Sequence, residues 1–240
     1  MKSLTVLQTR EMMYYICDRV IAAKQRLTAL DGIIGDGDHG IGMSRGMTRA
    51  REALTVTNRE TANDRARSDS EEDSDQMTVF VPKTINDIFY CMGRNMISTM
   101  GGSSGVIFGT MFMGAVKGLA PVDKLDGRTL TVMMRNALTE IQKRGKAAAG
   151  EKTMVDALEP AVLAMEAALY GEPAGNCPDL PVLLKAGADA ARAGAEATKD
   201  MISKHGHSKT LGERALGHAD PGAVSVEIIF RAMEEYCGSC

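Results

Sequence analysis

The chain has 240 residues, a length that suits one domain with a sizeable hydrophobic core. Hydrophobic residues make up 44% of it but aromatic residues only 4%, and 17 methionines with no tryptophan predict a core of small, flexible side chains, as in closely packed helices. The formal net charge of -3 excludes the broad basic surface of a nucleic-acid-binding protein. We expect partners among proteins and small molecules, and we treat residues 1–240 as a single domain.

The sequence also argues against export and against a membrane span. The first residues contain no apolar stretch of signal-peptide length before charged residues follow. The longest weakly polar run, residues 102–119, is interrupted by glycines and by Lys117 and is short for crossing a bilayer. We predict a cytoplasmic protein without membrane association.

In chain order, apolar residues first recur at helical spacing from Met12 to Leu27, and the pattern resumes from Ile41 to Leu54. Both segments are predicted to be helices, with an acidic, glycine-rich loop between them. Beyond residue 55 the periodicity disappears, and acidic residues cluster between serines. We interpret residues 56–80 as a solvated, mobile insertion, with a binding role as the alternative.

Six further helices are predicted in the rest of the chain. Thr84 can cap the first of them with Asp87 in its first turn, and Asp220 can cap the last, with Pro221 at the first helical position. Only the run Val79–Val81 has a strand-like composition. The total of eight helices predicts an all-α bundle. The six segments are 85–96, 105–119, 130–147, 153–170, 180–202 and 221–236.

The loop after the first predicted helix is a candidate magnesium site. It places Asp31, Asp36 and Asp38 within eight positions, with glycines between them that let the backbone turn. Magnesium takes oxygen ligands and often bridges protein carboxylates and substrate phosphates. The alternative is a solvated Asp/Gly turn, which we disfavour because three acids are followed directly by His39.

Two other segments have a composition that suits ligand binding. The turn Gly101–Gly105 offers free backbone N–H groups and serine hydroxyls at a predicted helix N-terminus, which suits phosphate oxygens, although such turns are common. The stretch 206–222 holds two histidines, Asp220 and several glycines, and it is long for a structureless loop. Magnesium and phosphate sites in one chain suggest a nucleotide.

Four motifs, in order and spanning nearly the whole chain, resemble those of a known family. They are G-D-G-D-H-G at 35–40, G-G-S-S-G at 101–105, G-x-K-T-M at 150–154 and L-G-E-R-A-L-G-H-A-D-P-G-A at 211–223. The chain is similar in them to the nucleotide-binding L subunit of dihydroxyacetone kinases, the DhaL family. The resemblance implies an eight-helix antiparallel barrel with the nucleotide and magnesium site at one end.

The resemblance also implies roles for individual residues. Asp31, Asp36 and Asp38 match the family's magnesium ligands, which hold two ions against the nucleotide phosphates. For Met154 plain core packing is an equal alternative. The positions that match nucleotide or phosphate contacts are His39, Gly40, Ile41, Gly42, Ser103, Ser104, Gly145, Met154, His207, Asp220, Pro221 and Gly222.

The sequence departs from the family at three positions of these motifs. Gly42 and His207 stand where asparagine and arginine are usual, and Thr210 where tyrosine is common. A histidine cannot provide the permanent bidentate fork of an arginine. The departures leave open whether ADP is retained or ATP is exchanged.

The function implied is transfer of a phosphoryl group from Mg²⁺-bound ATP, or from rephosphorylated ADP, to dihydroxyacetone or a related short ketose held on a separate K subunit. The expected partners are that K subunit and, if ADP is retained, a phosphotransferase-system donor protein; a homodimer is a further possibility. The alternative function is a non-catalytic nucleotide sensor that docks on a transcription regulator. The pair Cys237 and Cys240 is interpreted as reduced thiols of a frayed tail.

Overall fold

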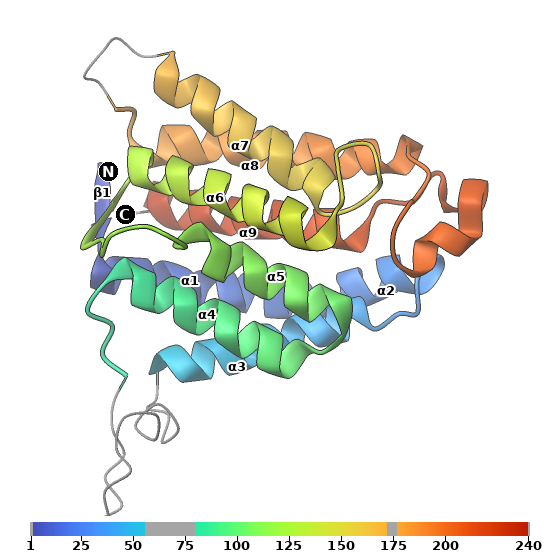
Figure 1. Cartoon of the computed structure of the whole chain (residues 1–240), viewed down its shortest axis with the longest axis horizontal. Coiled ribbons are helices and arrows are strands. Elements are labelled where there is room, and N and C mark those ends of the chain that lie inside the picture. Colours follow the sequence, from blue (N-terminus) through green and yellow to red (C-terminus); the bar gives the residue numbers. More distant parts are fainter. Residues whose placement is uncertain (1, 56–79, 172–176, 240) are drawn as a thin grey trace, which may run out of the picture.

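The computed structural model describes residues 2–55, 80–171 and 177–239. Over these residues the chain is mainly helical, with two strands of three residues each, so the predicted all-α class is confirmed (Figure 1). The elements are β1 (Ser3–Thr5), α1 (Val6–Ala22), α2 (Lys24–Ile34), α3 (His39–Thr55), α4 (Ile85–Met100), α5 (Gly102–Ala115), β2 (Lys124–Asp126), α6 (Gly127–Gly145), α7 (Val155–Tyr170), α8 (Leu180–Ala197), η1 (Thr198–Asp200), η2 (His207–Ala215) and α9 (Pro221–Ser239).

Eight of the helices form a closed ring. Each of α3 to α8 packs on the next helix in chain order, and α1 closes the ring by packing on both α3 and α9. This arrangement is the expected eight-helix barrel. The ninth helix arises because the first predicted segment is divided by a turn at Ala23, so that α2 extends one end of the ring and packs on α3 and α9.

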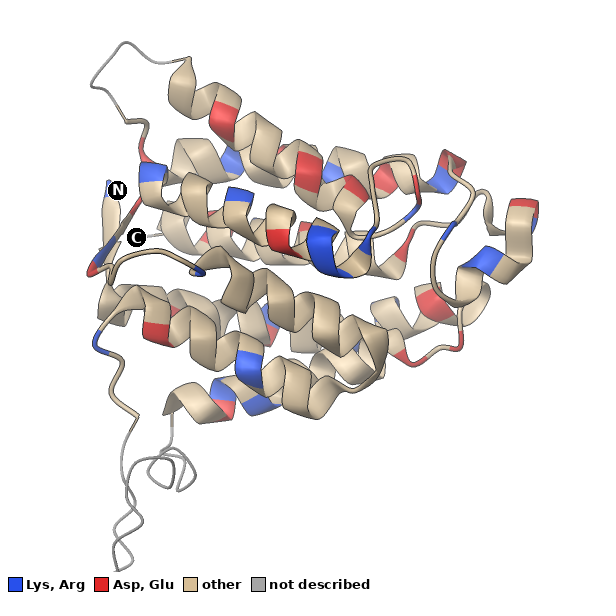
Figure 2. Cartoon of the chain, viewed as in Figure 1, with Lys and Arg blue, Asp and Glu red and all other residues tan. Residues whose placement is uncertain are grey.

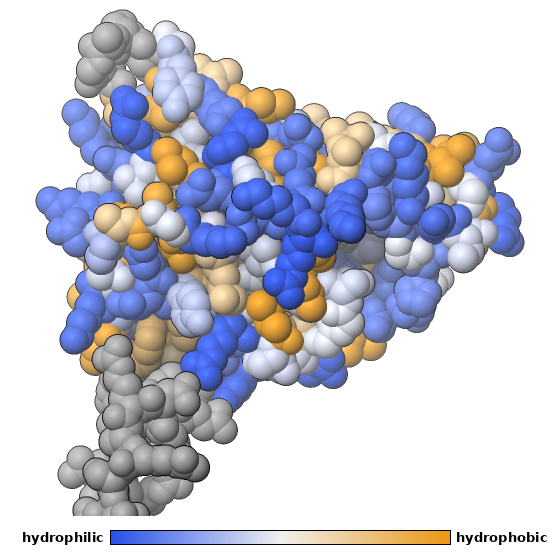
Figure 3. Space-filling model, in the orientation of Figure 1, coloured by the Kyte–Doolittle hydropathy of each residue, from blue (hydrophilic) through white to orange (hydrophobic). Residues whose placement is uncertain are grey.

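The interior of the ring is filled by methionine, leucine and alanine side chains with few aromatic rings, as the composition predicts. Phe89, Phe108 and Phe230 are its largest buried apolar side chains. On the face drawn in Figure 3 the surface is mainly hydrophilic, with hydrophobic residues in scattered patches. Within the described residues no helix is long and apolar enough to cross a membrane.

Both predicted helix caps are present. At the start of α4 the Thr84 hydroxyl accepts from the Asp87 N–H at 3.2 Å, and the Asp87 carboxylate accepts from the Thr84 N–H at 2.8 Å. At the start of α9 the Asp220 carboxylate accepts from the Ala223 N–H at 2.8 Å. These bonds satisfy N–H groups that have no partner inside the helix.

The strand prediction is wrong where it can be checked. Phe80 and Val81 lie outside any strand, whereas Val79 lies outside the described residues. The two strands are β1 and β2, which pair antiparallel with Leu4 opposite Leu125, both fully buried. Three-residue strands separated by more than a hundred positions have too little alternation to be recognised in sequence.

Two other predictions concern the ends of the described segments. The acidic insertion at 56–80 lies outside the described residues except for Phe80. The frayed C-terminal tail is wrong for Cys237, which is buried in α9, while Cys240 lies outside the described residues. Burial of Cys237 follows from the extension of the apolar face of α9 by one turn beyond the predicted end.

Candidate active site

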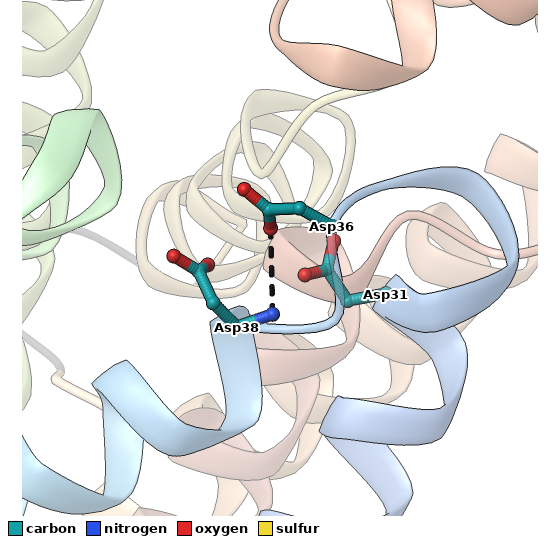
Figure 4. Close-up of side chains that lie close together, drawn as sticks. All are labelled: Asp31, Asp36 and Asp38. Carbon is teal, nitrogen blue, oxygen red and sulfur yellow. Dashed lines mark hydrogen bonds between the residues drawn. The ribbon is translucent and has the colours of Figure 1, made fainter.

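The three aspartates converge on one point at the end of the barrel that α2 extends. Asp31 lies in the last turn of α2, Asp36 in the loop and Asp38 directly before α3 (Figure 4). One carboxylate oxygen from each lies within 4.8 Å of the others. The loop after α2 therefore carries acidic positions at the open end of the ring, as Figure 2 shows.

Backbone hydrogen bonds fix the loop in this shape. The Gly35 N–H donates to the Asp31 carbonyl at 2.6 Å, and the His39 N–H donates to the Asp31 carboxylate at 3.0 Å. The Asp38 N–H donates to the Asp36 carboxylate at 3.4 Å. Asp31 is mostly buried, whereas Asp36 and Asp38 face the solvent, so one carboxylate is held by the fold and two remain accessible.

Burial, hydrogen bonds and neighbouring charges shift the pKa values of Asp36 and Asp38 in opposite directions. Burial and the neighbouring Asp36 raise the pKa of the Asp38 carboxyl group. For Asp36 the effect of burial also raises the pKa, but the Asp38 N–H and His207 outweigh it, so that the net pKa is lowered. A divalent cation between these oxygens would relieve the repulsion. Three carboxylates, two of which are accessible from solvent, provide the hard oxygen ligands that magnesium prefers.

The carboxylates line a cavity of about 420 Å³ at the open end of the ring. The turn before α5 also lines this cavity, and in it Gly101 and Gly102 take the positive φ angles 74° and 61° that favour glycine. The first bond of α5 runs from the Gly105 N–H to the Gly101 carbonyl, so the N–H groups before Gly105 precede the helical ladder. The cavity thus has acidic ligands on one wall and amide donors on another.

The structure brings most of the predicted site residues to this cavity, including all three aspartates. Gly222 and Met154, which are far apart in sequence, are adjacent there: a Cβ on Gly222 would lie 3.4 Å from the Met154 Cβ. The other predicted residues that line the cavity are His39, Ile41, Gly42, Ser103, Ser104, His207, Asp220 and Pro221.

Two predicted residues do not line the cavity. A Cβ on Gly40 would lie 2.4 Å from atoms of Lys24 and Thr28, so Gly40 permits the close approach of α3 to α2. A Cβ on Gly145 would lie 3.2 Å from the Ile107 side chain, which itself lines the cavity. Both glycines lie one layer behind the cavity surface.

The side chain of His39 joins helices of the site. It is 5% exposed, its Nε2 lies 2.8 Å from the Ser225 hydroxyl, and its ring is 5.8 Å from the Phe108 ring. The Ser225 hydroxyl donates to the Pro221 carbonyl at 2.9 Å, so the imidazole Nε2 is the donor in the His39 pair. Burial lowers the pKa of His39 to about 4, which keeps the ring neutral. His39 thus links the aspartate loop to the start of α9.

His207 reaches across the mouth of the cavity. It begins η2 and its Nε2 lies 3.1 Å from the Asp36 carboxylate, although the stretch 206–222 is remote from the aspartate loop in sequence. A second link between loops lies nearby, where His205 Nε2 is 2.7 Å from the Glu151 carboxylate. These contacts place the segment before α9 over the opening of the site.

Sequence reasoning gave no role to two basic residues of the cavity wall. Lys152 is 1% exposed, and its ammonium group donates to the carbonyls of Thr198 and His218, each at 2.5 Å. Arg45 lines the cavity from α3 and donates to the Met100 carbonyl at 2.6 Å. The G-x-K-T-M motif indicated Lys152, but the burial of this side chain depends on contacts with η1 and with the segment before α9. Nothing local in the sequence marks Arg45.

Lys152 lies beside a buried carboxyl group. Asp220 is in the cavity wall, and burial raises its pKa to about 7 although the Ala223 N–H and Lys152 oppose this. Burial likewise lowers the pKa of Lys152. A second acid, Asp156, accepts from the Gly150 and Thr153 N–H groups at 2.5 and 2.7 Å and so fixes the loop that carries Lys152.

Comparison with known proteins agrees with this architecture. A family model described as the DAK2 domain matches residues 70–235. The ADP-binding subunit DhaL of PEP-dependent dihydroxyacetone kinase 1 from Listeria innocua is 36% identical over 90% of this chain and 89% of its own length. The corresponding DhaL subunit from Escherichia coli is 31% identical over 86% of this chain and 85% of its own length.

The fold is also that of a solved kinase. The dihydroxyacetone kinase of C. freundii, in complex with AMP-PNP and Mg²⁺, superposes with a TM-score of 0.62 and 25% sequence identity over 98% of this chain. This chain spans 34% of the length of that kinase chain. The fold and the similarities define a component of a phosphotransferase. More particularly, the chain belongs to the family of ADP-binding DhaL subunits of dihydroxyacetone kinases.

Proposed function

We propose that this protein carries the nucleotide of a two-component kinase, which transfers a phosphoryl group to dihydroxyacetone or a related short ketose held on a K subunit. The observation that carries the proposal is the convergence of Asp31, Asp36 and Asp38 in a cavity that the amide-rich turn before α5 also lines. Magnesium at these carboxylates would neutralise phosphate charge, which is the main requirement of phosphoryl transfer. The chain's own residues then have to position the nucleotide.

The proposed division of roles follows the walls of the cavity. Asp31, Asp36 and Asp38 are the proposed metal ligands, with two magnesium ions as the finer proposal. The turn at Ser103 and Ser104 faces the phosphates with N–H and hydroxyl donors. His39, Ile41, Gly42 and Met154 provide further nucleotide contacts, with Gly40 against α2 and Gly145 behind Ile107 as supporting positions. The segment of His207 and residues 220–222 closes the site.

Retained ADP is the form of the nucleotide that the relatives favour. Several that cover most of this chain are named ADP-binding subunits of PEP-dependent or PTS-dependent kinases. By this reading a phosphotransferase-system protein rephosphorylates bound ADP, and the subunit works in the cytoplasm. One tightly held ADP per purified chain would support it. An empty site that exchanges ATP in each cycle would contradict it and favour ATP as the donor.

Reconstitution tests the proposed reaction. The protein is mixed with a dihydroxyacetone kinase K subunit, with dihydroxyacetone or erythrulose as acceptor and with MgATP or a complete phosphotransferase-system donor. We expect formation of the sugar phosphate with one donor, which mass spectrometry detects. Absence of product with every donor and acceptor, while nucleotide still binds, would overturn the kinase proposal in favour of the sensor function.

A further inference from the structure

We propose that Arg45 binds the phosphate chain of the nucleotide. This inference rests on the proposed nucleotide-binding function and adds a residue to it. Arg45 lies in the middle of α3, its side chain lines the same cavity as the three aspartates, and Nη2 is 2.6 Å from the Met100 carbonyl. This hydrogen bond holds the guanidinium group at the last residue of α4, directly before the glycine–serine turn.

The position of Arg45 along α3 defines a track across the cavity. The Gly42 N–H donates to the Asp38 carbonyl at 2.8 Å, so the helical ladder already includes Asp38. Residues four and seven positions apart share a helix face, which places Asp38, Gly42 and Arg45 in one line. At 1.5 Å per residue the two ends are about 10 Å apart. Gly42, between them, also lines the cavity, and a Cβ there would lie 3.3 Å from the Met100 Cγ.

The guanidinium group also adjoins the proposed phosphate turn. A Cβ on Gly101 would lie 3.7 Å from Arg45 Nη2. The bond to Met100 uses one N–H of a group that has five, so further donors of the same planar fork remain for phosphate oxygens. Guanidinium groups match phosphate geometry with paired hydrogen bonds. Arg45 can therefore hold the turn and contact the ligand at the same time.

The charges around the cavity single out this residue. Among the described residues that line it, four are aspartates and two are permanently basic, Arg45 and Lys152. Lys152 is 1% exposed, and its ammonium group donates hydrogen bonds to two backbone carbonyls. Arg45, in contrast, is exposed and forms no ion pair with a carboxylate in the described part of the chain. Of these two basic residues, Arg45 is therefore the one whose side chain is accessible to a bound phosphate.

The test replaces Arg45 by glutamine and measures the affinity for Mg²⁺–ADP and for adenosine by calorimetry at several salt concentrations. We expect Arg45→Gln to weaken Mg²⁺–ADP binding by about tenfold or more, since hydrogen bonds to charged groups are among the strongest. Adenosine binding should not change, and the salt dependence of ADP binding should decrease. Arg45→Lys should recover part of the affinity through its charge.

The matched control is Arg49→Gln, one turn further along α3, where Arg49 pairs with Glu52 at 3.5 Å outside the cavity. It should bind Mg²⁺–ADP like the wild type. Equal ADP affinity in Arg45→Gln and the wild type would overturn the inference. So would an equal loss for ADP and adenosine, because a merely structural role of the Met100 contact would affect both. Failure of the wild-type protein to bind Mg²⁺–ADP would instead overturn the proposed function.

Discussion

At the scale of single residues, the site combines carboxyl groups in two different environments. Asp36 and Asp38 are accessible and lie close enough together to perturb each other. Asp220 is half-buried in the cavity wall at the start of α9 and lies near the ammonium group of Lys152. The accessible pair Asp36 and Asp38 can bind a cation from solution, whereas Asp220 forms part of the cavity wall. The roles of these carboxyl groups can therefore be tested one at a time by substitution with asparagine, which keeps the shape of the side chain.

Asp36→Asn tests the metal site. The side chain of Asp36 is 45% exposed, so the variant should fold normally. If Asp36 is a magnesium ligand, the variant loses most of the stabilisation that Mg²⁺–ADP gives the wild type, because a ligand raises the stability of the state that it binds. Thermal melts with and without Mg²⁺–ADP measure this. Asp123→Asn, at an exposed position outside the cavity, is the control, and an undiminished shift in Asp36→Asn would remove Asp36 from the site.

Asp220 predicts a pH dependence of stability in the nucleotide-free protein. Burial raises its pKa to about 7, so the folded protein holds this proton more strongly than the unfolded chain. Its contribution to the free energy of unfolding is complete below the ordinary carboxyl pKa of 3.8 and is lost as the pH rises toward 7 and above. The loss amounts to at most about 4 kcal/mol.

Asp220→Asn should remove this loss. The amide oxygen can still accept from the Ala223 N–H but carries no charge, so the variant should gain stability relative to the wild type between pH 5 and about 8. Urea unfolding across this pH range measures the difference. The control is Asp126→Asn, because Asp126 caps α6 in the same way at a half-exposed position. A constant difference between wild type and Asp220→Asn at all pH values would contradict the argument.

At the scale of elements, the close approach of α2 and α3 shapes the aspartate loop. Gly40 permits this approach, because any side chain there would collide with the backbone of α2 at Lys24 and Thr28. The function of this glycine is therefore indirect: it sets the distance between the helix that carries Asp31 and the helix that follows Asp38. The resemblance to the family placed Gly40 in a segment of ligand contacts, whereas the packing gives it a structural role.

Gly40→Ala should separate α2 from α3 and destabilise the protein by about 1–3 kcal/mol, the usual cost of overpacking. It should also weaken Mg²⁺–ADP binding, because the carboxylates would move apart. The control is Gly32→Ala in α2, where an added Cβ meets no atom within 4 Å and alanine favours the helix. Urea unfolding measures both variants, and equal stability of the two would show that the α2–α3 contact tolerates a side chain.

At the scale of the whole molecule, the cavity is built from segments that span the chain. It draws residues from the α2–α3 loop, the start of α5, the loop before α7 and the segment before α9. These segments meet because the ring of helices closes between α1 and α9. A ligand in the cavity therefore contacts several helices at once and should stabilise the ring as a unit.

We predict that Mg²⁺–ADP at a hundred times its dissociation constant stabilises the protein by about 2.7 kcal/mol. For a chain of this length the corresponding increase in melting temperature is about 5–10 °C. Calorimetric melts measure it. Removal of magnesium with a chelator should abolish most of the increase. The same increase with ADP in the presence of the chelator would contradict a magnesium-dependent site.

The sequence by itself determined the helical class, two helix caps and the convergence of the three aspartates, because each depends on local spacing or on glycines and acids within a few positions. The motif resemblance determined the family. Tertiary structure alone decided that Arg45 and Lys152 belong to the cavity, that Gly40 serves packing and that His207 reaches Asp36. Their positions depend on closure of the ring and on contacts between segments remote in sequence, for which local periodicity carries no signal.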